Sequence, residues 1–425
     1  MIGFVGLSHL GLNYSLATAA KGFDVVAYDP EPALARRCAA GDFPIEEPGF
    51  DGLYAGCRAR LHYTSDASRL GECELVFYAL DIRTDANNRS DVGPLDALIR
   101  ATAPALGMGA TAVVLSQVSP GYTRRLAAQL TQHPDVKAGS VLYQVETLIF
   151  GSAVQRAMEP ERYIVGAPEG GQTLPRALRD WHAAFGCPVL VMKYESAELA
   201  KIAINFFLVS NVSTTNTLAE VCEAIGANWF EIVPALQLDR RIGKYAYLHP
   251  GLGIAGGNLE RDLVTVLQLS ARHGTDDGVI RAWQANSAHR REWPLQWLQR
   301  GLLAGAHDPV IAVWGLTYKA DTHSTKNSPS LELLRGLCGR RVRAHDPLAV
   351  IDAQEFGWVT RCASPLDAAA GADALVVMTP WKLYGSVETP ALRAAMKGRL
   401  TLDPYGALDE GRCRGVGLDY HRLGC

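Results

Sequence analysis

A glycine-containing loop near the amino terminus has the residue types that hold a dinucleotide. The apolar run at residues 2–5 leads into residues 6–11, GLSHLG, which is G-x-G-x-x-G with Ser8 at the second glycine. In such loops the first glycine allows a tight turn and the third lets helix and strand approach, while the helix amino terminus stabilises pyrophosphate. Because Ser8 adds a side chain where backbone usually meets the phosphates, we expect a looser or displaced fit. The residues expected to hold the cofactor here are Gly6, Ser8, His9, Leu10 and Gly11.

An acidic residue follows this loop at the spacing that dinucleotide sites use. The second apolar run ends at Tyr28-Asp29-Pro30, about 20 residues further on. A carboxylate there accepts hydrogen bonds from the hydroxyls of a ribose. It also repels a 2′-phosphate, and this repulsion favours NAD over NADP. The alternative is a plain strand–turn–helix connection with a capping aspartate. Strand, loop, helix and acid in register favour NAD as the cofactor.

The elements that must position this loop read as alternating strands and helices. Short apolar runs ended by Gly, Asp, Ser or Pro predict buried strands, and the helical patterns between them indicate a parallel sheet covered on both faces. We expect this first domain to reach about residue 190. The predicted strands are 2–5, 24–28, 75–80, 111–115, 141–144, 163–165 and 189–192.

A long helix and a second alternating unit follow. Residues 196–223 contain no Gly or Pro and repeat apolar residues with a helical period, so they predict one long central helix. Strand-like runs then recur at 309–315, 341–347, 374–379 and 400–403. The predicted fold class is α/β, with two Rossmann-like doubly wound domains joined by a long central helix. The expected boundaries are 1–190 for the NAD-binding domain, 191–300 for a helical connector, and 301–425 for a second Rossmann-like domain.

Composition limits the classes of partner. The chain has 425 residues, 48% hydrophobic and 20% charged, with a formal net charge of −3. This charge gives no electrostatic case for binding nucleic acid or an anionic membrane. The nine cysteines are scattered without a C-x-x-C pair, so neither a disulfide framework nor a metal site is expected. No apolar stretch reaches the length of a membrane helix, and we expect a cytoplasmic protein.

Six further segments, in order along the chain, resemble the UDP-glucose/GDP-mannose dehydrogenase family. Among them SQVSPG resembles the family's S-T-V-P-P-G turn, ETLIFGSA resembles P-E-F-L-x-E-G-x-A, and AELAKIAIN resembles A-E-L-x-K-x-x-x-N. GLTYKADT resembles G-x-x-[FY]-K-x-x-T at the start of the last domain. Several motifs in one order are far more specific than a lone glycine loop. The six segments are 41–49, 116–121, 146–153, 197–205, 239–253 and 315–322.

The resemblance implies oxidation of a sugar C6 alcohol to a carboxylate by two successive hydride transfers to NAD. A cysteine thiolate captures the intermediate aldehyde, and the resulting thioester is hydrolysed by water. A lysine and an asparagine stabilise the oxyanions, and an aspartate assists proton transfer through water.

Carried over residue by residue, the resemblance assigns these catalytic roles. Lys201 matches the lysine and Asn205 the asparagine, and their i, i+4 spacing puts both on one helix face. Asp262 matches the aspartate, although an acid in the first turn of a helix is also favoured by the helix dipole alone. Glu146 matches a glutamate that positions the substrate or assists hydrolysis. Ser116 and Gln117 fall in the turn expected to contact the cofactor.

The resemblance breaks at the nucleophile. Residues 253–262, GIAGGNLERD, align without a gap to the family's G-x-G-G-S-C-[FL]-x-K-D, so Asn258 stands at the cysteine position. Asparagine has no thiol and cannot form a thioester. An additional interpretation is that Asn258 caps the helix that starts at Leu259. Gln117 and Phe150 also replace residues of family motifs near this chemistry.

Three functions remain open from the sequence. The first is an NAD-dependent oxidoreductase that acts on a nucleotide sugar without a thioester and makes a two-electron product, an aldehyde or keto sugar. Full oxidation through a hydrated aldehyde would need Glu146 or Glu260 as base. Cys222, at the end of the central helix, is the one candidate for a replacement thiol. The second is an epimerase or isomerase that retains NAD. The third is a catalytically silent nucleotide-sugar-binding homologue.

The same resemblance suggests substrate-binding residues and an assembly. Arg241 and Lys319 are expected at the phosphates, because a guanidinium binds phosphate through two hydrogen bonds and a lysine supplies a positive charge. In the family, the arginine that Arg241 matches reaches the substrate from the neighbouring subunit. The resemblance implies that the connector, residues 191–300, is also a dimerisation domain that forms a homodimer across the long helix. It further implies that domain 301–425 binds the nucleotide sugar. The residues expected at the nucleotide sugar are Glu146, Lys201, Asn205, Arg241, Tyr247, Gly253 and Lys319.

Overall fold

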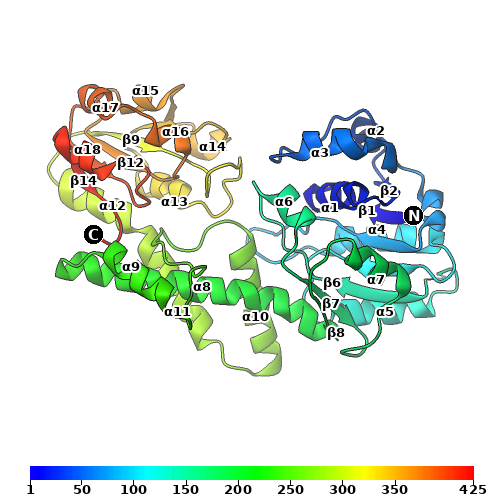
Figure 1. Cartoon of the computed structure of the whole chain (residues 1–425). Helices are drawn as coiled ribbons and strands as arrows, with labels where there is room; N and C mark the ends of the chain where they lie inside the picture. Colours follow the sequence, from blue (N-terminus) through cyan, green and yellow to red (C-terminus); the bar gives the residue numbers. More distant parts are fainter. Residues whose placement is uncertain (137) are drawn as a thin grey trace. The chain divides into compact units, whose positions relative to one another are not determined.

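The computed structural model describes residues 1–136 and 138–425 and divides them into two compact units. Unit 1 spans Met1–Ile204 and unit 2 spans Asn205–Cys425. Figure 1 shows the elements in chain order, from blue to red. The boundary lies inside one continuous helix, α8, which runs from Tyr194 to Ile225. The sequence predicted a helix over residues 196–223, and α8 confirms that prediction.

Unit 1 contains, within the described residues, one eight-stranded sheet with the order β3-β2-β1-β4-β5-β6-β7-β8. The strands pair in parallel except β6 with β7, which are antiparallel because the chain reverses after β6 with only the short α6 in between. All seven predicted strands are present, and β3 is an addition that the half-exposed sequence LHYT did not signal. The strands are β1 (Ile2–Val5), β2 (Val25–Tyr28), β3 (Leu61–Thr64), β4 (Leu75–Tyr78), β5 (Thr111–Val114), β6 (Ser140–Gln144), β7 (Tyr163–Ala167) and β8 (Val189–Lys193).

Helices cover both faces of this sheet. One apolar cluster joins the strands to α1, α3, α6 and α7, and a second joins them to α4, α5 and the start of α8 (Figure 1). The helices are α1 (His9–Ala20), α2 (Pro32–Ala39), α3 (Phe50–Cys57), α4 (Gly93–Thr102), α5 (Tyr122–Gln132), α6 (Ala153–Met158) and α7 (Arg176–Ala183), with short 3₁₀ turns η1 (Arg58–Arg60), η2 (Ala67–Glu72) and η3 (Ala103–Ala105).

The strand order of unit 1 creates a crevice at one edge of the sheet. Connections from β1 and β4 leave in opposite directions, since β2 lies beside β1 and β5 beside β4. Ligands of doubly wound sheets bind at the carboxyl ends of the strands at such a switch point. The Gly6 loop follows β1 and residues 79–82 follow β4, so both stand at this crevice.

Unit 2 starts with helices and ends in a second parallel sheet, with the order β11-β10-β9-β12-β13-β14. Its four predicted strands are present, with β11 and β14 in addition. The helices are α9 (Trp229–Leu238), α10 (Asn258–His273), α11 (Gly278–Arg291), α12 (Trp293–Leu298), the π-helical turn η4 (Gln299–Leu303), α13 (Pro329–Gly336), α14 (Ala353–Phe356), α15 (Pro365–Ala369), α16 (Lys382–Gly385), α17 (Thr389–Ala395) and α18 (Glu410–Gly415). The strands are β9 (Val310–Trp314), β10 (Arg341–His345), β11 (Thr360–Arg361), β12 (Ala374–Val377), β13 (Leu400–Leu402) and β14 (Asp419–His421).

The two sheets repeat one local design. In unit 1 the Leu7 N–H donates to Asp29 at the end of β2, and in unit 2 the Leu316 N–H donates to Asp346 at the end of β10. Asp346 also accepts N–H groups of Leu348 and Ala349, so its carboxylate is used to fix loops. These hydrogen bonds hold the pKa of Asp346 below its usual value against the opposing effect of burial, which is the larger single influence. The two α/β domains that the sequence predicts are confirmed.

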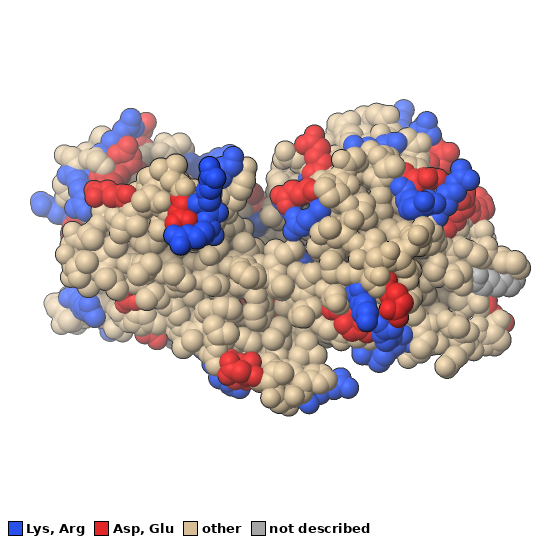
Figure 2. Space-filling view, turned by 60° about the horizontal axis from the view of Figure 1, so that its bottom comes forward, with Lys and Arg blue, Asp and Glu red and all other residues tan. Residues whose placement is uncertain are grey.

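Charged side chains are intermixed on the face drawn in Figure 2. Lys and Arg lie in small groups beside Asp and Glu, with wide uncharged areas between them. Within residues 1–136 and 138–425, no helix is long and apolar enough to cross a bilayer.

Candidate functional site

The loop after β1 has the backbone that a dinucleotide requires. Gly6 has a φ of +101°, and a Cβ on Gly11 would lie 1.8 Å from the Gly6 carbonyl oxygen, so both positions depend on glycine. The helix α1 begins at His9 directly after the turn. Asp29 accepts the Leu7 N–H at 2.9 Å and lies at the end of β2, where the sequence predicted a ribose acceptor. These residues fit a dinucleotide.

The Ser8 side chain does not point along the loop toward α1. Its hydroxyl donates to the Ala79 carbonyl at 3.0 Å and accepts the Asp81 N–H at 3.0 Å, so it ties the loop to the segment after β4. The Asp81 carboxylate in turn accepts the Leu10 N–H, at 3.3 Å. Sequence reasoning missed Asp81, although its position after a buried strand on the same edge as Gly6 was a usable signal.

His9 is held by a carboxylate and an aromatic ring. Its Nε2 lies 2.7 Å from Glu47 Oε1, and its ring centroid lies 4.2 Å from that of Phe150. Glu47 is buried and also accepts the N–H groups of Gly151 and Ala153 at the start of α6. The segments 41–49 and 146–153, which both resemble family motifs, therefore meet at His9 of the cofactor loop inside unit 1.

Ser116 and Gln117 follow β5, at the same carboxyl edge of the sheet. The Ser116 hydroxyl accepts the Leu80 N–H at 2.9 Å and is fully buried, so it fixes the segment after β4. Gln117 is half-buried beside it. Both residues thus lie along the crevice expected to hold the cofactor. Ser116 contributes by holding the backbone of Leu80, which lines the crevice.

Lys201 forms an ion pair inside unit 1. Its Nζ lies 3.1 Å from Glu146 Oε1, and the two side chains are 12% and 16% exposed. The second oxygen of Glu146 accepts the Leu148 N–H at 3.0 Å. Two residues that the sequence assigned to one catalytic group are thus in direct contact, and Lys201 is not a solvated surface lysine.

A buried carboxylate fixes the part of α8 that carries Lys201. Glu198 accepts N–H groups of Gly121 and Thr123, at 2.5 and 2.8 Å, and so caps the amino end of α5. Burial raises the pKa of Glu198, against the opposing effect of these hydrogen bonds. Lys201 stands one helical turn further along α8.

Asn205 and Asp262 form the corresponding contact in unit 2. Asn205 Nδ2 donates to Asp262 Oδ2 at 2.5 Å, and both side chains are buried. Arg261 Nε lies 3.3 Å from the other carboxylate oxygen, with a side chain that is 7% exposed. Asp262 is therefore more than an acidic residue favoured by the dipole of α10. It also holds the side-chain amide of Asn205, which is predicted to stabilise an oxyanion.

Asn258 is the first residue of α10 and is exposed. The cap is Gly257, and no side-chain hydrogen bond caps this helix, so the interpretation of Asn258 as an N-cap is wrong. The preceding backbone turns into the helix one residue early because Gly257 already has helical angles. The amide of Asn258 is thus not used to cap the helix.

The loop that presents Asn258 is anchored by a network that sequence reasoning missed. The Arg291 guanidinium contacts the Ile254 carbonyl and the Glu260 carboxylate, and it also pairs with Glu332 at 2.7 Å. Asn327 Nδ2 donates to the Gly256 carbonyl at 2.8 Å. Glu260 is therefore held in an ion pair, and nothing in its local sequence signalled that partner.

The residues predicted at the nucleotide are spread over unit 2. Arg241 is exposed and pairs with Asp239 at 2.6 Å, and Tyr247 is 46% exposed. The Lys319 ammonium lies 5.9 Å from the centroid of the Tyr318 ring. Gly253 packs against Ser287.

Burial suppresses thiolate formation at several of the cysteines. Cys222 is buried in an apolar cluster with Ala219 and Trp229. Burial raises the pKa of Cys38, Cys73 and Cys413 to about 11. The nine thiols are all unpaired: Cys38, Cys57, Cys73, Cys222 and Cys413 are buried, Cys187 and Cys362 are half-buried, and Cys338 and Cys425 are exposed.

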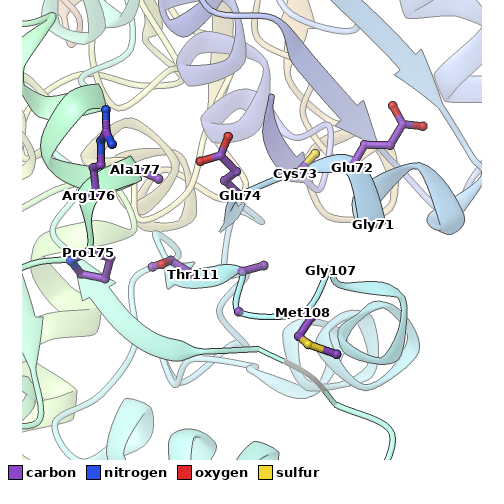
Figure 3. A pocket seen from close by; sticks show the side chains of 12 residues that line it. Gly71, Glu72, Cys73, Glu74, Gly107, Met108, Thr111, Pro175, Arg176 and Ala177 are labelled. Atoms are coloured by element: carbon purple, nitrogen blue, oxygen red, sulfur yellow. The ribbon is translucent and has the colours of Figure 1, made fainter.

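A cavity of about 340 Å³ lies at the opposite end of the unit 1 strands. Figure 3 shows Glu74, Thr111 and Pro175 around it, and Glu74 directly precedes β4. Since ligands of doubly wound sheets bind at the carboxyl ends of the strands, this cavity is not part of the cofactor crevice.

Comparison with known proteins covers nearly the whole chain with three models of one family. Residues 1–183 match the NAD binding domain, residues 195–288 the central domain and residues 312–410 the UDP binding domain of the UDP-glucose/GDP-mannose dehydrogenase family.

Curated and solved relatives agree with these matches. UDP-glucose 6-dehydrogenase of Pseudomonas aeruginosa is 28% identical, with 99% of this chain and 96% of the relative covered. The enzyme of the same name from Rhizobium meliloti is also 28% identical, with 95% and 94% covered. A solved UDP-glucose dehydrogenase from Pyrobaculum islandicum has a TM-score of 0.85 and 26% identity, with 99% of this chain and 96% of that chain covered.

Proposed function

Because the chain belongs to the UDP-glucose/GDP-mannose dehydrogenase family, we propose that it oxidises a nucleotide sugar with NAD but without a cysteine thioester. NAD is the family's cofactor, and the loop of Gly6 and Gly11 fits it. UDP-glucose is the first substrate to test, since the relatives named above are UDP-glucose dehydrogenases. The expected product is two electrons more oxidised than the substrate, an aldehyde or a keto sugar.

One contrast supports this proposal. Lys201 and Asn205 are kept and each is held by a carboxylate, whereas position 258 carries an exposed asparagine. Groups that stabilise a negatively charged oxygen are therefore present, and a thiol at the matching position is not. Taking such groups out of water costs free energy even when they are paired, so their retention favours a catalytic protein over a pure binding protein.

The chain's own residues would act on the oxygen of the substrate alcohol. NAD, when bound, supplies the acceptor for the hydride that leaves the alcohol carbon. The Lys201 ammonium has three N–H donors, of which one faces Glu146, and the Asn205 amide has a second N–H besides the one used by Asp262. These remaining donors would stabilise the alkoxide as its proton leaves through water.

Without a thiol, the reaction would stop after one oxidation. The family's second step needs an acyl group held on sulfur, and Asn258 cannot form that bond. Oxidation through a hydrated aldehyde would need a carboxylate base. Glu146 is engaged by Lys201 and by the Leu148 N–H, and Glu260 by Arg291, so both candidates are already committed to partners.

The test is to incubate the purified protein with UDP-glucose and NAD, count the NADH formed per sugar and determine the product mass. One NADH per sugar with an aldehyde or keto product is expected. A uronate with two NADH per sugar would overturn the proposal.

The alternative functions give different results in the same experiment. A product isomer formed without net NADH, by protein that retains NAD through purification, would indicate an epimerase or isomerase. Calorimetry that detects sugar-nucleotide binding but no NAD binding would indicate a silent binding protein.

We also propose a homodimer formed through α8. In unit 2 this helix exposes Phe207, Leu218, Val221 and Ile225, with exposed fractions of 44–76%. Their spacings of 11, 3 and 4 residues place them on one face of a helix, and such an apolar stripe is typical of a protein interface. Sedimentation of the native protein and of Phe207→Asp tests this, because the charged variant is expected to sediment as a monomer.

A further inference from the structure

An acidic side chain occupies the amino end of α1, at the position where a dinucleotide places its pyrophosphate. The Asp81 carboxylate accepts a hydrogen bond from the N–H of Leu10 at 3.3 Å. Leu10 belongs to the loop that runs from Gly6 to Gly11. Pyrophosphates of dinucleotides are held by the N–H groups at this end of the first helix. An internal anion and the cofactor's anion thus use the same donor.

Ser8 fixes this arrangement. The Asp81 N–H donates to the Ser8 hydroxyl at 3.0 Å, and that hydroxyl donates to the Ala79 carbonyl, also at 3.0 Å. The serine at the second glycine of the loop and the aspartate after β4 are therefore partners. A glycine at position 8 would leave the Asp81 backbone without this contact.

The charges around Asp81 do not cancel its effect on an incoming anion. His9 of α1 is a basic group that acts on Asp81, and its Nε2 is engaged by Glu47. Glu146, which follows β6, adds a second carboxylate toward Asp81, and it is itself paired with Lys201. Asp81 lies at the crevice, where its carboxylate already contacts the Leu10 N–H of the loop.

We propose that Asp81 sets the affinity of the cofactor site as an internal competitor for the Leu10 N–H. Binding of the dinucleotide requires the Asp81 carboxylate to give up this hydrogen bond and to stand beside the pyrophosphate charge. The negative charges of the Asp81 carboxylate and of the pyrophosphate repel each other when they are adjacent, so the ionised side chain lowers the affinity for NAD. The Ser8 hydroxyl strengthens the competition because it holds the Asp81 backbone at the loop.

The experiment measures the Kd of NAD by isothermal titration calorimetry for the native protein, Asp81→Asn and Ser8→Ala. Asp81→Asn keeps the shape and removes the charge, and we expect a Kd about tenfold lower, which corresponds to about 1.4 kcal/mol. Ser8→Ala keeps the Cβ and removes the hydroxyl, and we expect a smaller decrease in Kd. Glu74→Gln is the matched control, since it removes one carboxylate at the opposite end of β4 and should leave the Kd unchanged.

Salt gives an independent reading of the same effect. Raising NaCl from about 0.05 to about 0.5 M screens exposed charges, so the difference between the native protein and Asp81→Asn should shrink. An Asp81→Asn protein that binds NAD no better than the native protein, including the case in which neither binds, would overturn the proposal. Weaker binding by Asp81→Asn would overturn it as well, because Asp81 would then be an acceptor for the cofactor. If Asp81→Asn fails to fold, an unchanged Kd of Ser8→Ala decides against the proposal and a lower one supports it.

Discussion

Replacing Lys201 by methionine should separate the structural role of this lysine from its catalytic role. Methionine keeps much of the length and removes the charge, which leaves the Glu146 carboxylate without its cation. At 3.1 Å, two unit charges interact with about 5 kcal/mol at an effective dielectric of about 20. Desolvation of both groups offsets part of this, and deleting one partner of a buried pair typically costs about 3–5 kcal/mol. Because the side chains retain 12% and 16% exposure, we expect a loss near the lower end, about 3 kcal/mol.

The assay is urea unfolding followed by circular dichroism, combined with initial rates of NADH formation. The double variant Lys201→Met with Glu146→Gln should recover about half of the lost stability, because no unpaired carboxylate remains. It should not recover activity, since the oxyanion donor is still missing and such a donor contributes about 10²–10³-fold. Lys193→Met, an exposed lysine that ends β8, serves as control and should change stability by less than about 0.5 kcal/mol.

Two results would refute this reasoning. If Lys201→Met unfolds at the same urea concentration as the native protein, the ion pair with Glu146 does not contribute in the way its burial suggests. If the double variant regains full activity, Lys201 acts only by neutralising Glu146 and is not the donor to the substrate oxygen.

The other predictions concern the remaining parts of the site and the core. Asn258→Cys should introduce the missing nucleophile, and the same UDP-glucose assay should then detect some uronate and more than one NADH per sugar; an unchanged product would show that a thiol at this position is not sufficient. Asp262→Asn should lower stability by about 3 kcal/mol, because the negative charge beside the buried Arg261 guanidinium is removed, and should lower the rate of NADH formation; a native melting temperature would contradict this. His182 should destabilise the fold in acid. Burial lowers its pKa from 6.5 to about 4, so the unfolded chain binds more protons between these values and stability is lost as the pH falls through that window, by about 3 kcal/mol in total. His182→Gln should reduce the decline of urea stability between pH 6.5 and pH 4, and a decline equal to that of the native protein would count against the assignment.

The sequence by itself determined the fold class and the residue types of the chemistry. Short apolar runs bounded by turn residues indicated the strand positions because strands buried on both faces are predominantly apolar, as the fully buried β1, β4 and β5 show. The long helix followed from one uninterrupted apolar period. The edge strands β3, β11 and β14 were missed because they are partly exposed and carry no such run.

Only the tertiary structure decided which partner each polar residue takes. The i, i+4 spacing predicted that Lys201 and Asn205 share a helix face, but it did not show that Glu146 and Asp262, 55 and 57 residues away in the chain, hold them. Nor does any local pattern reveal that Ser8 binds the backbone of Asp81. Such contacts depend on where loops after different strands meet, which is set by the strand order of the sheet and not by the residues around each loop.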